Sequence, residues 1–145
     1  MFIRLYPNQL KPFWPLINET FDKAFPESAM VMKTALLKDL MLETAICWLS
    51  VHDENDEQIT DVVFITKLND DYAVGRKTVT IVAAYAPNGS NEQVFLEGFE
   101  AMKKYAASEN CSFFDFYTDN PRIIHYAEMF NPFWRSDYFQ MKISD

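Results

Sequence analysis

The segment Ala86–Asn91 holds the residues of this chain most suited to binding a ligand. It follows a β-branched run, Thr78–Tyr85, and precedes a segment with helical spacing of its apolar residues. A helix that starts just after a strand presents its first backbone N–H groups at the carboxyl end of that strand, where α/β proteins hold phosphate and pyrophosphate groups. These groups carry about half a positive charge and need no particular side chain. The sequence therefore predicts an anion site in this loop.

Three carboxylates in or beside expected strands could serve as bases, namely Glu43, Asp61 and Asp115. A buried carboxyl group has a raised pKa and can take a proton from an ammonium group. Asp115 lies between Phe114 and Phe116, so it faces the other side of its strand. Surface exposure or an ion pair is the simpler interpretation of all three, and the sequence leaves both open.

Neither the two histidines nor the two cysteines have the spacing of a metal site. His52 precedes an acidic stretch and is expected to be exposed, whereas His125 follows two apolar residues and is expected to be half-buried. Cys47 and Cys111 each lie beside an apolar run, which predicts buried thiols and no disulfide.

Aromatic residues are concentrated near the end of the sequence. They could line a substrate pocket or form a protein contact, since exposed aromatic side chains mark interfaces. Core packing is an equally good interpretation. The residues are Phe130, Phe133, Trp134, Tyr138 and Phe139, and Phe13 with Trp14 raises the same question.

The totals favour one folded domain spanning residues 1–145, with 49% hydrophobic residues, 16% aromatic residues and 3 glycines. A net charge of −8 repels nucleic-acid phosphates and anionic lipids, so neither partner is expected. The charge fits simple solubility, or an acidic surface that docks a basic partner or imitates nucleic acid. The sequence does not begin with a charged-then-apolar leader, and it has no apolar run of ~20 residues. This pattern predicts a cytoplasmic protein without a membrane span.

The elements that must position the loop can be read from apolar spacing and from prolines. The pattern predicts first a short strand, then two helices, then two strands joined by an acidic turn. Methionines and leucines of the second helix, including Met30, Leu37, Leu40 and Met41, are expected to pack. The expected ranges are Phe2–Tyr6, Leu10–Phe25, Glu27–Glu43, Thr44–Val51 and Ile59–Leu68.

The second half of the chain continues with a strand, a helix, a strand, a short helix and a last strand. Ser90 with Gln93 has the spacing of a capping box, which predicts the start of the long helix. A strand–helix–strand crossover makes two strands parallel in a sheet that is otherwise antiparallel. The expected ranges are Lys77–Tyr85, Ser90–Ser108, Ser112–Thr118, Pro121–Phe130 and Tyr138–Ile143.

This order, β-α-α-β-β-β-α-β-α-β with a mixed twisted sheet of about six strands, resembles the GCN5-related N-acetyltransferase superfamily over nearly the whole chain. The strongest local similarity lies in Tyr117–Phe130. Members of the family have an asparagine just after the fifth strand and then a small-apolar pair. Asn120 and the pair Ile123-Ile124 occupy those places. The resemblance implies an α/β (α+β) domain with the acyl-CoA N-acyltransferase-like fold.

In that family an acyl group passes from acyl-coenzyme A to an amine. The strands on either side of the third helix diverge, the freed strand pairs with the pantetheine arm, and the loop holds the pyrophosphate. The resemblance thus implies acetyl-CoA as the donor and an amine as the acceptor. The implied donor-binding residues are Tyr85, Ala86, Asn88, Gly89, Ser90, Asn91 and Asn120.

The loop and the last helix depart from the family pattern. Ala86 stands where the family has glutamine or arginine, and Asn91 stands at a place for glycine or alanine, so Gly89 is the one glycine of the pattern. The family tyrosine that protonates the leaving thiolate comes seven residues after the asparagine, where this chain has Ala127. Tyr126, one position earlier, is the candidate catalytic acid.

Two functions fit these residues. The first is an acyl-CoA-dependent N-acyltransferase-like protein with a degenerate pyrophosphate loop. The second is a non-catalytic copy of the fold that acts as an interaction or structural module, in the style of acetyltransferase-like proteins of bacteriophages, located in the virion or the host cytoplasm. A host-directed inhibitor is a third possibility. The sequence does not indicate the acceptor, a protein partner or the oligomeric state.

Overall fold

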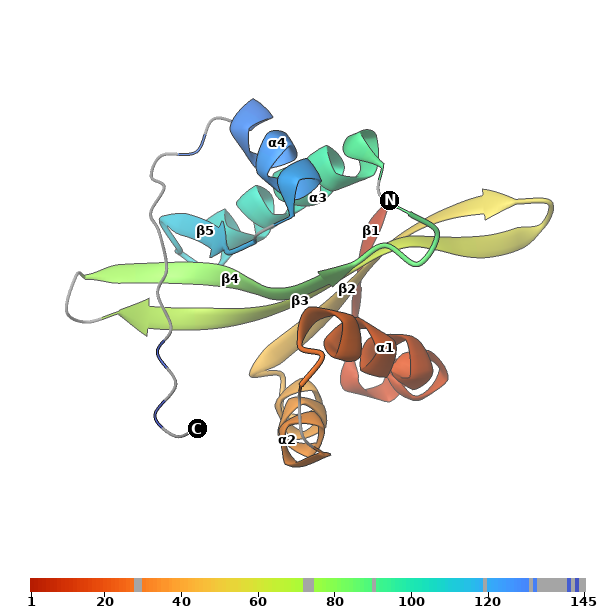
Figure 1. Cartoon of the computed structure of the whole chain (residues 1–145), viewed down its shortest axis with the longest axis horizontal. Helices are drawn as coiled ribbons and strands as arrows, with labels where there is room; N and C mark the ends of the chain where they lie inside the picture. Colours follow the sequence, from red (N-terminus) through yellow and green to blue (C-terminus); the bar gives the residue numbers. More distant parts are fainter. Residues whose placement is uncertain are drawn as a thin grey trace.

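A single five-stranded sheet separates two pairs of helices (Figure 1). The structure is a computed structural model that describes residues 1–27, 30–71, 75–89, 91–118 and 120–130, with Pro132, Met141 and Ile143. Helices α1 and α2 cover one face of the sheet, and α3 and α4 cover the other. The strands are β1 (Phe2–Leu5), β2 (Ala45–Glu54), β3 (Glu57–Asp71), β4 (Arg76–Tyr85) and β5 (Phe113–Phe116). The helices are α1 (Trp14–Ala24), α2 (Met30–Met41), α3 (Glu92–Ser108) and α4 (Pro121–Met129).

The sheet is mixed, as the sequence predicts. Its strands follow the order β1-β2-β3-β4-β5, and each of the first three neighbouring pairs is antiparallel. Helix α3 connects β4 to β5, and this crossover makes the last pair parallel. The expected strand Tyr138–Ile143 lies mostly outside the described residues. Among those described, the sheet therefore has five strands where about six were expected.

Alternation along the strands divides the core into two parts. Cys47, Leu49 and Ile65 belong to the cluster that α1 and α2 cover, and Val62 and Phe64 belong to the cluster under α3 and α4. Successive side chains of a strand point to opposite faces, and both faces of this sheet are covered by helices. The strands consequently read as nearly continuous apolar runs. No described helix combines the length and the apolar character that crossing a membrane requires.

The first helix begins later than expected. Residues Pro7–Gln9 and Lys11–Phe13 form two 3-10 turns, and α1 begins only at Trp14 with Pro15 in its first turn. Pro12 cannot donate a backbone hydrogen bond, so the preceding segment forms short turns in place of a helix. Phe13 and Trp14 are partly buried against the cluster under α1 and α2, so both contribute to core packing.

The prediction that the methionines of α2 pack into the core is wrong. Leu36 and Leu40 are its buried residues, whereas Met30 is 75% exposed and Met41 is 51% exposed. Leu37 is 36% exposed. Apolar residues occur all around this helix, so their spacing does not identify the buried side.

The acidic stretch between the second and third strands is mostly strand and not loop. β2 runs to Glu54 and β3 begins at Glu57, so the connection is the two-residue turn Asn55-Asp56. Both residues have positive φ, 52° and 64°, as tight hairpin turns of the favoured hand require. Asparagine and aspartate tolerate that conformation best after glycine. The hairpin therefore extends beyond the rest of the sheet (Figure 1).

Helix α3 is capped one residue later than the sequence predicts. Asn91 is the N-cap, and its Oδ1 accepts a hydrogen bond from the backbone N–H of Val94 at 3.3 Å. Gln93 donates from Nε2 to Oε1 of Glu97 at 3.2 Å. Ser90, the expected cap, lies outside the described residues. Strand β5 is also shorter than expected, since Tyr117 and Thr118 follow it without joining the ladder.

Candidate functional site

Strands β4 and β5 stop pairing halfway along β4. The last pair in their parallel register is Ile81 with Phe116, yet β4 continues to Tyr85. Val82 has no partner on β3 either, because Ile65 pairs with Ala83 and Thr66 pairs with Ile81. A bulge of this kind bends its strand and increases the local twist. Residues 83–85 therefore pair with β3 on one side and leave their other edge without a β5 partner, so the two strands diverge.

The loop after β4 starts with a hydrogen-bonded turn. The backbone N–H of Gly89 donates to the carbonyl of Ala86 at 3.1 Å, and Gly89 has φ of +95°. A side chain at such a φ is strained, which accounts for the glycine. No atom lies within 4 Å of the position that a β-carbon at Gly89 would take, so the space beside it is open. Asn88 donates from Nδ2 to the carbonyl of Thr60 at 3.4 Å, which ties the loop to β3.

The start of α3 lies directly after this loop, as the sequence predicts for an anion site. Its backbone N–H groups are those that a phosphate would use, but Asn91 already accepts one of them, that of Val94. Glu92 in the first turn adds a negative charge. The helix start thus retains unused donors, with less positive potential than an uncapped and uncharged terminus.

Tyr85 connects the end of β4 to α1. Its hydroxyl donates to Oε1 of Glu19 at 2.8 Å, and this bond to the carboxylate raises the pKa of Tyr85. The ring therefore points to the α1 side of the sheet, away from α3. Its backbone is what remains at the diverging edge.

Tyr126 lies near the loop and is buried. It is 7% exposed, and its ring centroid is 5.6 Å from that of Phe95 in the first turn of α3. Ala86 packs against the same cluster. Helix α4 is a regular α-helix from its Asn120 cap to Met129. Tyr126 therefore faces the start of α3 without any extra residue in α4.

Asn120 has a local structural role. Its Oδ1 accepts a hydrogen bond from the backbone N–H of Arg122 at 3.0 Å and so caps α4. The side chain is exposed, and no hydrogen bond joins it to the described residues of the β4–α3 loop. The structure thus brings Ala86 and Tyr126 together near the start of α3, sets Asn88 and Gly89 beside them along the chain, and leaves Asn120 apart.

The three carboxylates singled out in the sequence are all partnered, and none is fully buried. Glu43 is 3.4 Å from Nη2 of Arg4. Asp61 binds Nδ1 of His52 at 2.8 Å. Asp115 is exposed and accepts a hydrogen bond of 2.6 Å from the hydroxyl of Thr80, its register partner on β4. Exposure and pairing are the interpretation that the structure supports.

His52 is exposed, as predicted, but it belongs to a cluster that the sequence did not reveal. Its Nδ1 faces Asp61 and its Nε2 lies 3.3 Å from Glu54, and these hydrogen bonds raise the pKa of His52. Regular pairing would place Asp61 opposite Ser50. A bulge leaves Asp61 unpaired between Val62 and Thr60, two residues from Ile59, the register partner of His52. No feature of the sequence marks that bulge.

Other expectations for reactive groups are corrected in part. His125 is exposed and not half-buried. Cys47 is buried, which raises the pKa of its thiol to about 12, whereas Cys111 is only partly buried. Both cysteines are free. In the described ranges, no group of three or more potential ligands could hold a metal ion. Phe130 packs in the α3 cluster, and the other residues of the C-terminal aromatic group lie outside the described residues.

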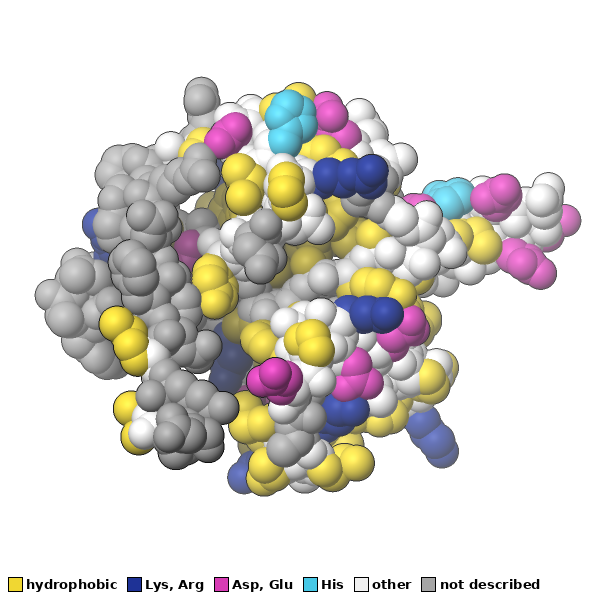
Figure 2. Space-filling view, viewed as in Figure 1, with side chains coloured by type: hydrophobic (Ala, Val, Ile, Leu, Met, Phe, Trp, Pro, Cys, Tyr) yellow, Lys and Arg dark blue, Asp and Glu magenta, His cyan; other side chains and the backbone are white. Residues whose placement is uncertain are grey.

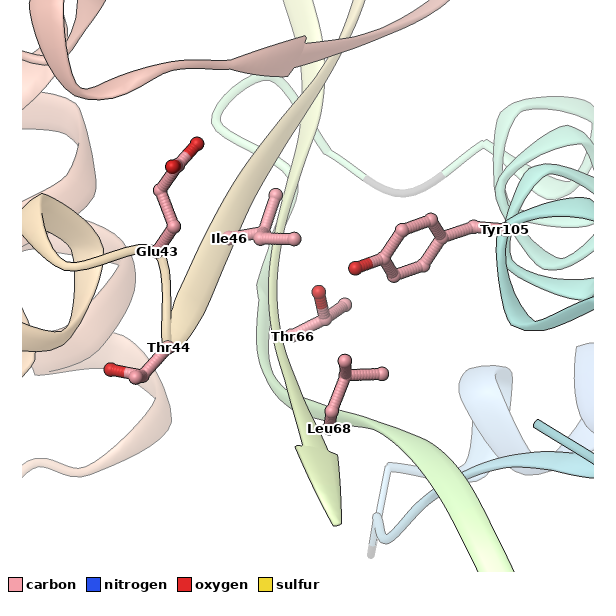
Figure 3. Close-up of a pocket in the computed structure, with 6 residues that line it drawn as sticks. All are labelled: Glu43, Thr44, Ile46, Thr66, Leu68 and Tyr105. Carbon is pink, nitrogen blue, oxygen red and sulfur yellow. The ribbon is translucent and has the colours of Figure 1, made fainter. Parts of the chain in front are cut away.

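A separate pocket of about 230 Å³ lies near the opposite end of α3 (Figure 3). The hydroxyl of Tyr105 points from α3 toward Ile46 and Thr66 on the sheet. Burial raises the pKa of Tyr105. Pockets that hold drug-sized ligands have volumes of about 300–1,000 Å³, so this pocket is small. Its lining residues are Glu43, Thr44, Ile46, Thr66, Leu68 and Tyr105.

Comparison with known proteins identifies the fold. No protein-family model matches the sequence, and no curated protein matches it. Among solved structures, a probable acetyltransferase is similar over 100% of this chain and 99% of its own, with a TM-score of 0.73 and 15% identity. An aminoglycoside acetyltransferase from an uncultured soil metagenomic sample, in complex with sisomicin, is similar over 99% of this chain and 95% of its own, with a TM-score of 0.74 and 13% identity.

A third similar structure carries the donor itself. It is a predicted acetyltransferase with acetyl-CoA from Clostridium acetobutylicum, similar over 99% of this chain and 96% of its own, with a TM-score of 0.71 and 9% identity. These likenesses extend over nearly the whole of this chain and of the similar chains. The chain therefore has the acyl-CoA N-acyltransferase fold of the GCN5-related N-acetyltransferases.

Proposed function

We propose that this protein is an N-acyltransferase that uses acetyl-CoA to acylate an amine. The observation that carries this proposal is the divergence of β4 from β5 beyond Ile81, with a bulge at Val82 and a loop that leads into a helix start. The free edge of β4 offers backbone donors and acceptors to an extended ligand, in the manner of an added strand. Acetyl-CoA supplies the acetyl group as a reactive thioester when it is bound.

Each part of the chain has a role in this proposal. Residues 83–85 would pair with the pantetheine arm through their backbone, and the loop residues Asn88, Gly89, Ser90 and Asn91 would surround the pyrophosphate. The open space beside Gly89 supports this placement. Tyr126 would give the proton of its hydroxyl to the departing thiolate. Its position between α4 and the first turn of α3 supports that role. General acids of this kind contribute typically 10²–10⁴-fold to a rate.

The binding step can be tested with two glycine variants. Acetyl-CoA at millimolar concentration should raise the melting temperature of the wild-type protein, because a ligand of the folded state at about 100 times its Kd adds about 2.7 kcal/mol of stability. Gly89→Val should remove this shift, since a branched side chain would fill the loop. Gly75→Val is the matched control. Gly75 also has positive φ and open surroundings, but it lies in the turn between β3 and β4.

The outcomes separate binding from mere strain. Equal loss of stability in both variants, with loss of the acetyl-CoA shift only in Gly89→Val, supports the proposal. An absence of any shift in the wild-type protein would refute it. For the chemical step, Tyr126→Phe should retain the shift and lower the release of free coenzyme A with an amine by about 10²-fold or more.

A second candidate function is a non-catalytic interaction or structural module with the same fold. The use of one N–H at the α3 start by Asn91 favours it, and so do the exposed apolar side chains of α2, among them Val31, at 70%, and Met32, at 54%. Such a module would suit a bacteriophage protein of the virion or the host cytoplasm. The same thermal-shift experiment separates the candidates. Under this second function acetyl-CoA has no effect, and the protein sediments with a partner or as a fixed oligomer.

A further inference from the structure

A chain of hydrogen bonds crosses three strands just before β4 and β5 diverge. Asn69 of β3 donates from Nδ2 to the hydroxyl oxygen of Thr80 on β4 at 2.6 Å, and that hydroxyl donates to Oδ1 of Asp115 on β5 at 2.6 Å. Because Thr80 accepts one bond and donates the other, its hydroxyl proton is directed at the carboxylate. Asp115 is thereby held in one orientation.

The position of this carboxylate is adjacent to the divergence. Thr80 pairs with Asp115, and the next pair, Ile81 with Phe116, is the last before the strands separate. We call the point after this last pair, where β4 and β5 separate, the vertex. A strand rises about 3.3 Å per residue, so the carboxylate lies roughly that distance from the vertex along the sheet. A group bound at the vertex would have Asp115 as its nearest acidic neighbour on β5.

Access to the vertex differs between the two faces of the sheet. On the α3 side, Phe99 stacks on Phe116 with ring centroids 5.2 Å apart, and Phe130 packs against both Phe99 and Phe114. That side is closed by aromatic rings. Thr80 and Asp115 alternate with Ile81 and Phe116, so they lie on the other face, the one where Lys67 reaches Asp39 of α2. Among the described residues, the Asp115 side is therefore the more open approach for a reactant that comes from solvent.

None of the ion pairs between described residues involves Asp115. Lys67, the register partner of Thr80, lies 3.2 Å from Asp39, and the guanidinium of Arg76 lies over the ring of Phe113. The only hydrogen bond of Asp115 within the described ranges uses Oδ1, which leaves Oδ2 available. The net charge of −8 adds a general attraction for cations. A fixed and exposed carboxylate is a suitable partner for an ammonium group.

We propose that Asp115 determines acceptor specificity by binding the ammonium form of a primary alkylamine at the vertex, on the face opposite α3. This inference rests on the proposed N-acyltransferase function. Asp115 makes a charged hydrogen bond to the ammonium group, which must give one proton to water before its nitrogen can attack the thioester, and Thr80 is a positioning residue that fixes the carboxylate. A cationic alkylamine is thus preferred as acceptor to a neutral aromatic amine.

The test compares two acceptors of the same size, cyclohexylamine and aniline. At about pH 7.5 the first is protonated and the second is neutral. Asp115→Asn keeps the shape of the side chain and an oxygen for the Thr80 hydroxyl, but removes the charge. We expect it to raise the KM for cyclohexylamine by about 10-fold or more and to leave kcat/KM for aniline unchanged. The acetyl-CoA thermal shift should also stay as in the wild type.

Three further variants sharpen the test. Asp53→Asn removes the same charge from the projecting hairpin and should change neither KM. Thr80→Val should raise the KM for cyclohexylamine by about 3-fold with little effect on kcat, and Thr80→Ser should restore the wild-type value. A merely structural role of Thr80 would lower stability and kcat for both acceptors alike.

Binding can also be followed without turnover. Amide resonances of residues 78–81 and 113–116 should shift when cyclohexylamine is added to the wild type, and should not shift in Asp115→Asn. Equal KM changes for both amines, or resonance shifts that persist in Asp115→Asn, would overturn the inference. If acetyl-CoA still raised the melting temperature in that case, the proposed function would stand. A wild-type protein that shows neither the acetyl-CoA shift nor acetyl transfer would overturn both.

Discussion

On one side of the sheet, α3 and α4 bury an aromatic cluster in which Phe64, Phe95 and Phe99 are each less than 5% exposed. On the other side, α1 packs closely, but α2 leaves methionines in solvent, and the β4–β5 corner carries Thr80 and Asp115. Figure 2 shows apolar side chains on the exposed surface of the α2 end of the molecule.

The two faces both stabilise the fold, but they differ in the access that they give to the point where β4 and β5 diverge. Apolar area removed from water is the main source of folding free energy, and both faces supply it, since each side of the sheet has its own cluster of buried apolar residues. On the α2 face, several apolar side chains of α2 stay exposed to solvent. This is also the face from which a reactant can reach the point where β4 and β5 diverge. Substitutions of buried residues on either face should therefore affect folding, whereas substitutions of exposed residues near Asp115 should affect binding.

The largest effect is expected from Phe64→Ala. Phe64 is fully buried, and its ring lies 5.3 Å from that of Phe2 and 5.9 Å from that of Phe95. Loss of the ring leaves a cavity and should lower the free energy of unfolding by about 3–5 kcal/mol. Denaturant unfolding measures this. Leu68→Ala is the control on the same side of β3, where the side chain is 40% exposed, and it should cost less than about 1 kcal/mol.

The second prediction concerns α2 on the opposite face. Leu40 is 2% exposed, so Leu40→Ala should cost about 2–4 kcal/mol. Met32 is 54% exposed, and Met32→Ala should stay within about 0.5 kcal/mol. Equal costs for the two variants would mean that a second copy covers the exposed side of α2 in solution. Sedimentation of the wild-type protein would then reveal an oligomer.

The third prediction tests how tightly the α3 face is packed. A β-carbon at Gly98 would lie 2.7 Å from the ring of Phe2 and 2.7 Å from that of Phe64. Gly98→Val should therefore overpack the core and cost about 1–3 kcal/mol, although valine is the better helix former. Glu100→Val, on the exposed side of the same helix, should cost less than about 0.5 kcal/mol. A neutral Gly98→Val would show that the aromatic rings can move apart.

The sequence predicts the two-faced sheet well, and for physical reasons. The β-branched run Thr78–Tyr85 can hardly be anything but a strand, and the helical spacing that follows it makes a parallel crossover necessary. Asn91 and Ser90 are both good caps one residue apart, so the sequence alone could not fix the start of α3. The position of the candidate loop was predicted, while the residue that caps its helix was not.

Two features of the candidate site could not be predicted. The bulges at Val82 and Asp61 depend on how whole strands fit against one another, and neither residue is unusual for a strand. The pairing of Thr80 with Asp115 depends on the β4–β5 register, which follows from the length of the crossover and not from a local pattern. In α2, apolar residues lie on every side of the helix, so the sequence alone does not show which of them are buried. It gave no reason to expect Leu36 in the core rather than Met32.

The smallest expected effect lies in the β2–β3 hairpin, which neither face of the sheet covers. Figure 2 shows acidic and histidine side chains on this projection. Hydrogen bonds to Asp61 and Glu54 raise the pKa of His52 above its ordinary value of 6.5, so the folded state holds this proton more tightly than the unfolded state does. The stability that results is fully present below about pH 6.5 and is lost as the pH rises through the folded-state pKa. His52→Gln should therefore lower the melting temperature more at about pH 5.5 than at about pH 8.5. The same loss at both pH values would indicate that the ring contributes through hydrogen bonds of its neutral form and not through its positive charge.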